Sequence, residues 1–130
     1  MKKIIILIFV LALNSAPLAF AQTNAARARV EAMFNSFQPG QIEMAIDAFA
    51  KDSLVPPSLV DQVASQAKNV LTPERTILGF EFVQEQNAGE SVKRLTYVLK
   101  LNDRPLFWNF SFYRPTNEWV PLRLYFSEEP

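Results

Sequence analysis

The chain lacks both side chains that carry much of enzymatic and metal-binding chemistry near neutral pH. Its 130 residues include no histidine and no cysteine. Without cysteine there is no disulfide, no thiolate nucleophile and no thiolate metal ligand, and without histidine there is no imidazole base or ligand. The composition therefore excludes serine–histidine–aspartate triads and ordinary zinc sites, and we expect neither a metal nor a cofactor.

Strong charge of one sign and glycine-rich loops are missing as well. Thirteen Lys and Arg balance 13 Asp and Glu, and the three glycines are the widely separated Gly40, Gly79 and Gly89. Binding to nucleic acid depends on neutralising phosphate charges, so we expect no nucleic-acid partner. Scattered glycines also exclude a phosphate-binding loop. What remains is a near-neutral chain of one-domain length with 49% hydrophobic residues.

The N-terminus has the pattern of a secretory signal peptide. Lys2 and Lys3 precede an unbroken apolar run over residues 4–13, and residues 19–21 read Ala-Phe-Ala, a small-x-small cleavage site. An uncleaved anchor is the alternative, but a spanning helix needs about 20 predominantly apolar residues, and polar residues and a proline interrupt this run. We therefore predict a signal peptide over residues 1–21.

The mature chain, residues 22–130, is expected to be one exported domain without a membrane segment. Removal of Lys2 and Lys3 leaves 11 basic and 13 acidic side chains, a net charge of −2. Small exported domains without cysteine are typical of the bacterial periplasm, which is the predicted location. Release to the medium is the alternative.

The first half of the mature chain has helical periodicity. Apolar residues recur three and four positions apart in three segments, which Pro39-Gly40 and Pro56-Pro57 separate. Ser58, followed by Asp61, resembles the start of the third helix. The residues expected to face the core are Ala26, Val30, Met33, Phe34 and Phe37, then Ile42, Ala45, Ile46 and Phe49, then Leu59, Val63, Ala67, Val70 and Leu71.

From Ile77 onward the period changes to two, which predicts four strands joined by short turns. Helices followed by such strands predict an α+β domain, with the N-terminal helices packed on one face of a curved four-stranded antiparallel sheet. The residues expected on the inner face are Leu78, Phe80 and Phe82, then Leu95, Tyr97, Leu99 and Leu101, then Leu106, Trp108, Phe110 and Phe112, then Val120, Leu122, Leu124 and Phe126.

The order of these elements and their aromatic pattern resemble the NTF2-like superfamily, also called the cystatin-like cone folds. The segments that carry the resemblance are residues 95–100, 105–113 and 118–122, which read LTYVLK, PLFWNFSFY and EWVPL. The chain is most similar to small exported members without an assigned function. The resemblance implies a cone with an internal pocket, and in many members a dimer through the outer sheet face. Members have a short strand between the second and third helices, for which only residues 53–55 are available here.

Four inner-face residues are the candidate ligand contacts. Tyr97 is the only hydroxyl on its otherwise apolar face, and a buried phenol normally needs a hydrogen-bond partner. Trp108, Phe110 and Phe112 line an apolar pocket if the cone is not completely filled. The alternative is that all four are packed core residues.

A catalytic carboxylate is not evident near this face. Some members of the superfamily, such as ketosteroid isomerases, pair an acidic base with a tyrosine, but Asp47 and Glu81 are both expected to point away from the core. We therefore favour a non-catalytic binding or interaction module for an apolar small molecule or an envelope protein. The alternative is a small cofactor-independent isomerase or hydratase that uses a carboxylate and Tyr97.

Aromatic residues are also expected on the outer sheet face. Alternation places Phe107, Tyr113, Trp119 and Tyr125 there, beside Arg123. Aromatic residues and arginine are enriched at protein interfaces, so this set predicts a homodimer interface. The alternative is that the aromatic side chains are loosely exposed.

Overall fold

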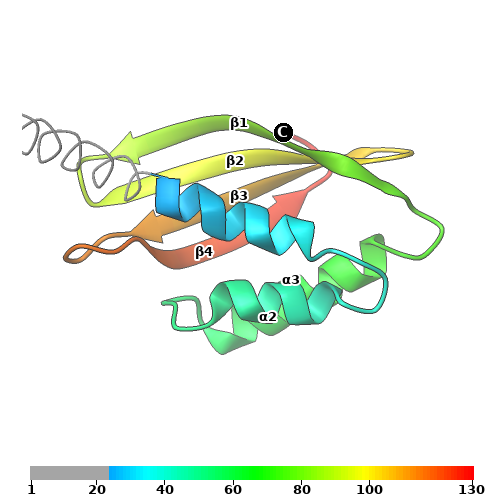
Figure 1. Ribbon diagram of the computed structural model, residues 1–130, viewed down its shortest axis with the longest axis horizontal. Helices are drawn as coiled ribbons and strands as arrows, with labels where there is room; N and C mark the ends of the chain where they lie inside the picture. Colours follow the sequence, from blue (N-terminus) through cyan, green and yellow to red (C-terminus); the bar gives the residue numbers. More distant parts are fainter. Residues whose placement is uncertain (1–23) are drawn as a thin grey trace, which may run out of the picture.

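The computed structural model describes residues 24–130, so the expected signal peptide lies outside the described residues. Three helices precede four strands, which confirms the predicted α+β arrangement (Figure 1). The elements are a first helix over residues 24–35, α2 (Ile42–Ala50), α3 (Pro57–Val70), β1 (Ile77–Ala88), β2 (Val92–Leu101), β3 (Pro105–Tyr113) and β4 (Val120–Ser127).

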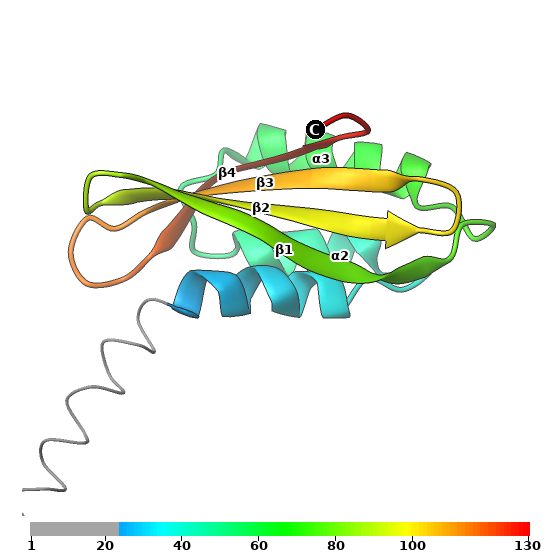
Figure 2. The ribbon, with the colours of Figure 1, turned by 90° about the horizontal axis from the view of Figure 1, so that it is seen from above.

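The sheet and the helices form two layers. The strands are antiparallel throughout and follow the order β1-β2-β3-β4. All three helices lie on one side of the sheet (Figure 1), and in the view from above the strands lie in front of α2 and part of α3, while the first helix runs beside β1 (Figure 2). We call the helix-covered side the inner face and the opposite side the outer face. The core therefore lies between the inner face and the helices.

The first helix and α2 bury the apolar stripes that their sequences predict. Every residue expected to face the core in these two helices is buried. Gly40 adopts a positive φ of 80° in the turn between them, a conformation that favours glycine. Arg29 donates from Nε (2.9 Å) and Nη2 (2.7 Å) to the carbonyl of Phe49, and so supplies donors to the C-terminal end of α2.

Helix α3 begins earlier and is rotated relative to the prediction. It begins at Pro57, because proline at the first helical position gives up no helical hydrogen bond; Ser58 is therefore not the cap. Val60 and Ala64 are buried, whereas Leu59 and Val70 are only partly buried. Residues 53–55 form no strand, although the Leu54 N–H donates to the carbonyl of Pro121 at the edge of β4 (2.9 Å).

The two central strands follow the predicted alternation without exception. The inner-face residues of β2 and β3 are all buried, and the strands pair without a register shift. Phe34 of the first helix packs against this face. Its ring centroid lies 5.4–5.8 Å from those of Phe37, Phe80, Tyr97, Trp108 and Phe110.

Both edge strands contain bulges that overturn parts of the prediction. In β1 the register shifts between Ile77 and Gly79, so Leu78 is 63% exposed and does not face the core. A second shift after Phe82 brings Glu85 opposite the buried Leu95. Paired residues share a sheet face, so Glu85 lies on the inner face.

In β4 the extra residue is Leu122. Arg123 pairs with Ser111 and Pro121 with Phe112, so Leu122 has no partner and is 39% exposed instead of buried. The bulge inverts the alternation of the residues before it. Pro121 is therefore buried and Trp119 packs against the core, which corrects the expectation that Trp119 lies on the outer face.

We expect Phe34→Ala to lower the free energy of unfolding by about 3–5 kcal/mol, because it removes the ring that five other aromatic side chains surround. Met44→Ala is the control, because Met44 is 70% exposed, and should change it by less than about 0.5 kcal/mol. Urea unfolding followed by tryptophan fluorescence measures both. A loss below about 1 kcal/mol for Phe34→Ala would show that the fold does not depend on this ring.

Candidate functional site

The four predicted ligand contacts lie in packed core. Tyr97, Trp108, Phe110 and Phe112 are fully buried, and the Phe34 ring occupies the space in front of three of them. None of the four lines a cavity described below. The structure therefore places all four as packed core residues, which was the alternative to ligand contacts.

The Tyr97 hydroxyl has a carboxylate partner that the sequence reasoning missed. It donates a hydrogen bond of 2.7 Å to Oε2 of Glu31, in the first helix. Burial, and secondarily this hydrogen bond, raises the pKa of Tyr97, so the phenol stays protonated and acts as a donor. Glu31 follows the buried Val30 and precedes the buried Phe34 by three residues. This position at the border of the apolar stripe could have indicated that Glu31 reaches the sheet.

Arg27 completes this small polar cluster beside β1. Its guanidinium lies 3.9 Å from the centroid of the Phe82 ring, and its Nε is 3.7 Å from Oε2 of Glu31. The side chains of Arg27 and Glu31 are about a third exposed. No cavity described here is lined by Arg27, Glu31 or Tyr97, so the cluster joins the first helix to β2 without a visible place for a substrate.

Lys93 is a second polar residue on the inner face. It lies two positions before the buried Leu95 and is only 2% exposed. Its Nζ is 3.9 Å from Oε1 of Glu85 and 4.2 Å from the centroid of the Trp119 ring. Burial lowers the pKa of Lys93, while Glu85 opposes that shift. The strand period could have placed Lys93 inward, but the bulges that bring Glu85 and Trp119 to it could not be read from the sequence.

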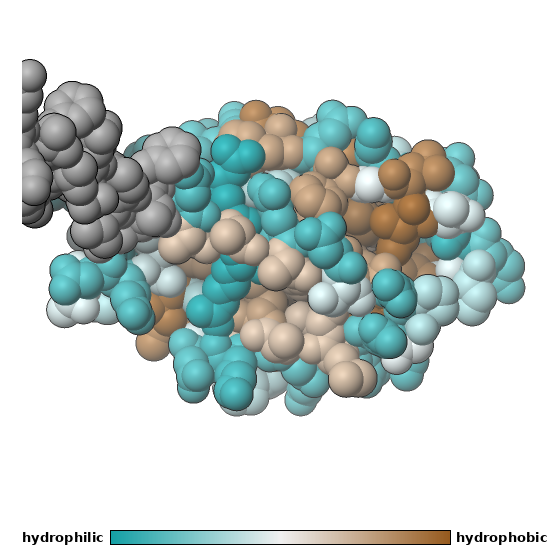
Figure 3. Space-filling view, viewed as in Figure 1, coloured by the Kyte–Doolittle hydropathy of each residue, from teal (hydrophilic) through white to brown (hydrophobic). Residues whose placement is uncertain are grey.

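Two adjoining cavities form a groove at one end of the molecule, which we call the end groove. Its walls are the turn between the first helix and α2, and the connection from α3 to β1. Strongly apolar surface gathers at this end, over the start of β1 (Figure 3). The cavities measure about 300 and 380 Å³ and share the wall residues Pro39, Ile42, Leu71, Thr72 and Pro73.

The larger cavity, the outer lobe, is mainly apolar. Besides the shared wall it is lined by Gly40, Met44 and an ion pair, in which Lys68 Nζ lies 3.3 Å from Glu43 Oε1. Because the two charges face each other, they leave the lobe without net charge. The outer lobe is suited to an apolar group.

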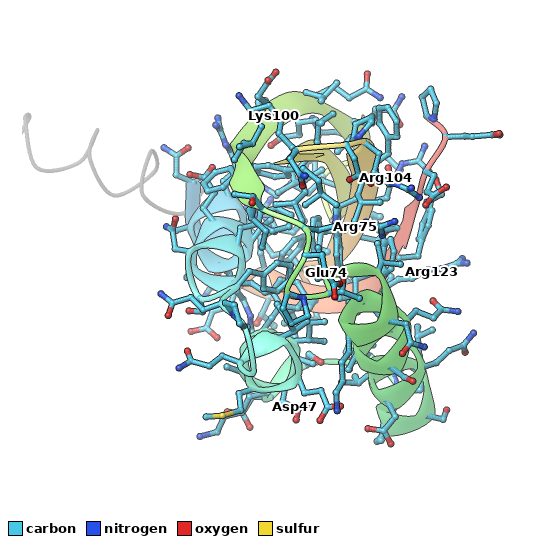
Figure 4. All side chains as sticks on the ribbon, turned by 90° about the vertical axis from the view of Figure 1, so that its right-hand side faces the viewer. Asp47, Glu74, Arg75, Lys100, Arg104 and Arg123 are labelled. Atoms are coloured by element: carbon cyan, nitrogen blue, oxygen red, sulfur yellow. The ribbon has the colours of Figure 1, made fainter. Side chains whose placement is uncertain are left out.

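The smaller cavity, the inner lobe, contains a positioned cation. Arg75 lines it together with Phe37, Gln38, Thr76 and Ile77. Figure 4 faces this end of the molecule and shows Arg75 between α3 and the sheet. Arg75 Nη1 donates to the carbonyl of Val70 (2.8 Å), which fixes the guanidinium at the end of α3.

The outer sheet face keeps part of the predicted interface. Tyr113 is 37% exposed, Phe107 and Tyr125 are half-buried, and the Arg123 guanidinium lies 5.2 Å from the centroid of the Tyr125 ring. Trp119 does not belong to this surface. In Figure 2 the helices do not cover the outer face, so these side chains are available to a partner.

The described residues also bear on metal binding and on membrane insertion. Within residues 24–130, no group of acidic side chains is arranged to hold a metal ion. Over the same range, no helix is long and apolar enough to cross a membrane.

Comparison with known proteins gave no relative from which a role could be transferred. No protein-family model matches the chain, and searches of curated proteins and of solved structures likewise found no match.

We expect the stabilising effect of Tyr97 to disappear at alkaline pH. Its pKa is raised above the ordinary value of 10.0, so the stabilisation is complete below that pH and is lost as the pH rises beyond it. Urea unfolding of the native protein and Tyr97→Phe, from about pH 8 to pH 11, measures this difference. The native protein should lose more stability over this range than Tyr97→Phe. Equal losses in the two proteins would contradict the assignment.

Proposed function

We propose that the mature protein is a non-catalytic binding module of the periplasm that holds an apolar small molecule in the end groove. The observation that carries this proposal is the pair of adjoining cavities, of about 300 and 380 Å³, with a largely apolar shared wall. Pockets for small ligands typically begin at about 300 Å³ and combine apolar walls with a few polar groups. The predicted signal peptide supports the periplasmic location.

The absence of usual catalytic groups supports binding over catalysis. The chain has no histidine and no cysteine. The polar groups of the end groove are the partly buried Arg75, the Lys68–Glu43 ion pair, two threonines and a glutamine. The carboxylate among them, Glu43, forms an exposed ion pair with Lys68 and lines the outer lobe but not the inner one. A ligand in the end groove would be held rather than converted.

A cofactor-independent isomerase or hydratase is the second candidate, and one observation favours it. The bond between Glu31 and Tyr97 supplies the acid and phenol pair that such a mechanism needs. We rank it second because Tyr97 is fully buried and no described cavity reaches the pair.

The order of helices and strands is what supports membership of the NTF2-like superfamily, which remains a proposal. We propose in the same way that the outer sheet face is a protein interface, with a second copy of the chain as its occupant. The exposed Tyr113, the half-buried Phe107 and Tyr125, and Arg123 support it.

We expect Met44→Gln to weaken the binding of 1-octanol to residues 22–130 about fivefold, because the exposed Met44 side chain lines the outer lobe. Leu54→Gln is the matched control. Leu54 is also exposed but lies outside the end groove, so this variant should bind 1-octanol as tightly as the native protein does. Amide chemical shifts during an octanol titration measure both affinities and locate the ligand. Shifts confined to other parts of the chain would contradict the proposed site.

The interface proposal predicts a dimer that Tyr125→Ala combined with Arg123→Gln weakens, by about tenfold or more in dissociation constant, because tyrosine and arginine carry much of the energy of interfaces. Sedimentation velocity over a concentration series measures it. Asp47→Asn, on α2 and away from the sheet, is the control (Figure 4). A native protein that is monomeric at every concentration would rule out self-association and leave an envelope protein as the partner.

A further inference from the structure

The two lobes of the end groove differ in charge, and this difference defines the class of ligand. We infer that the ligand is an anionic amphiphile whose apolar chain occupies the outer lobe and whose carboxylate binds the Arg75 guanidinium in the inner lobe. The inference rests on the proposed function, because it concerns the same groove.

The balance of charges around the end groove leaves one cation without a counterion in the wall. Among the described residues that line the inner lobe, Arg75 alone is charged, and the Lys68–Glu43 pair of the outer lobe is neutral as a unit. Glu74, although adjacent in the chain, lines neither cavity. The wall therefore carries a net charge of one positive unit, at the inner lobe.

The guanidinium is held in place and retains hydrogen-bonding capacity. Nη1 donates to the carbonyl of Val70 (2.8 Å), and Nε lies 3.3 Å from Oδ2 of Asp103. The structure gives Nη2 no hydrogen bond to a described residue, and 23% of the side chain is exposed. A guanidinium already fixed by protein groups loses little freedom when it binds a carboxylate, so this arrangement favours binding.

Asp103 is the counterion of Arg75, but it lies outside the wall of the end groove and is shared with a second arginine. The same Oδ2 atom lies 3.3 Å from Nε of Arg104, whose Nη1 also contacts Glu128. Arg75 and Arg104 therefore flank one carboxylate (Figure 4). A second carboxylate, from the ligand, would complete the coordination of Arg75 from the side of the cavity.

The neutral residues of the end groove match the two parts of such a ligand. Gln38, Thr72 and Thr76 place amide and hydroxyl groups around the inner lobe, where an anion can accept hydrogen bonds. Pro39, Met44 and the shared apolar wall offer contact to an alkyl chain in the outer lobe. The volumes of the two lobes are large enough for a medium-chain carboxylate.

Isothermal titration of residues 22–130 with sodium octanoate and with 1-octanol tests the inference, because the two probes differ only in the head group. We expect octanoate to bind about tenfold more tightly than octanol. Arg75→Gln should abolish this preference, because the affinity for octanoate falls about tenfold towards that for octanol. Lys51→Gln, which removes a cation that does not line the end groove, should preserve the preference.

The outcomes separate the inference from the proposed function. Equal affinities for octanoate and octanol, or a preference that survives Arg75→Gln, would overturn the carboxylate assignment and leave an apolar ligand in the groove. Failure of both probes to bind would overturn the proposed function as well. The comparison of octanoate with octanol uses the native protein, so it decides the question even if Arg75→Gln does not fold.

Discussion

The packing of Phe34 against the inner face of the sheet is the constraint on which the rest of the structure depends. Its ring meets five other aromatic rings, contributed by the turn after the first helix and by β1, β2 and β3. Stacking continues to Phe126, whose ring centroid lies 4.6 Å from that of Trp108. The Trp108 Nε1 donor has no hydrogen-bond partner among the described residues, whereas the Tyr97 hydroxyl donates to Glu31. Burial and ring packing therefore provide most of the stabilisation of this cluster, and one hydrogen bond adds to it.

Buried side chains fill the space between the helices and the inner face, so we expect a ligand site at the ends of the two layers. Two short connections lie at one end of the molecule, residues 36–41 between the first helix and α2 and residues 71–76 between α3 and β1, and the end groove lies where they meet. Arg75 links the same region to the sheet, because it contacts the end of α3 and the turn after β2. The groove is therefore built from the parts of the fold that the core leaves uncovered.

Sequence periodicity predicted correctly which side chains are buried wherever a strand is regular, and it failed wherever a strand bulges. Tyr97 and Trp108 were placed correctly because β2 and β3 pair without interruption. Leu78 and Leu122 lie at register shifts that one extra residue creates, beside Gly79 and Pro121, and these residue types permit a bulge without fixing where it falls. The end groove could not be predicted either. Its two walls lie about 30 residues apart in the chain, and only the tertiary fold brings Pro39 and Leu71 together.

We propose that a ligand binds in the end groove and not between the helices and the inner face of the sheet. The most direct test is a crystal structure of residues 22–130 soaked with 1-bromooctane, because anomalous scattering locates the bromine without reference to the rest of the density. The account predicts bromine in the end groove, within contact of Met44, Leu71 or Pro73. Bromine between the first helix and the sheet, beside Phe34 and Trp108, would contradict it and would show that the aromatic core opens to admit a ligand.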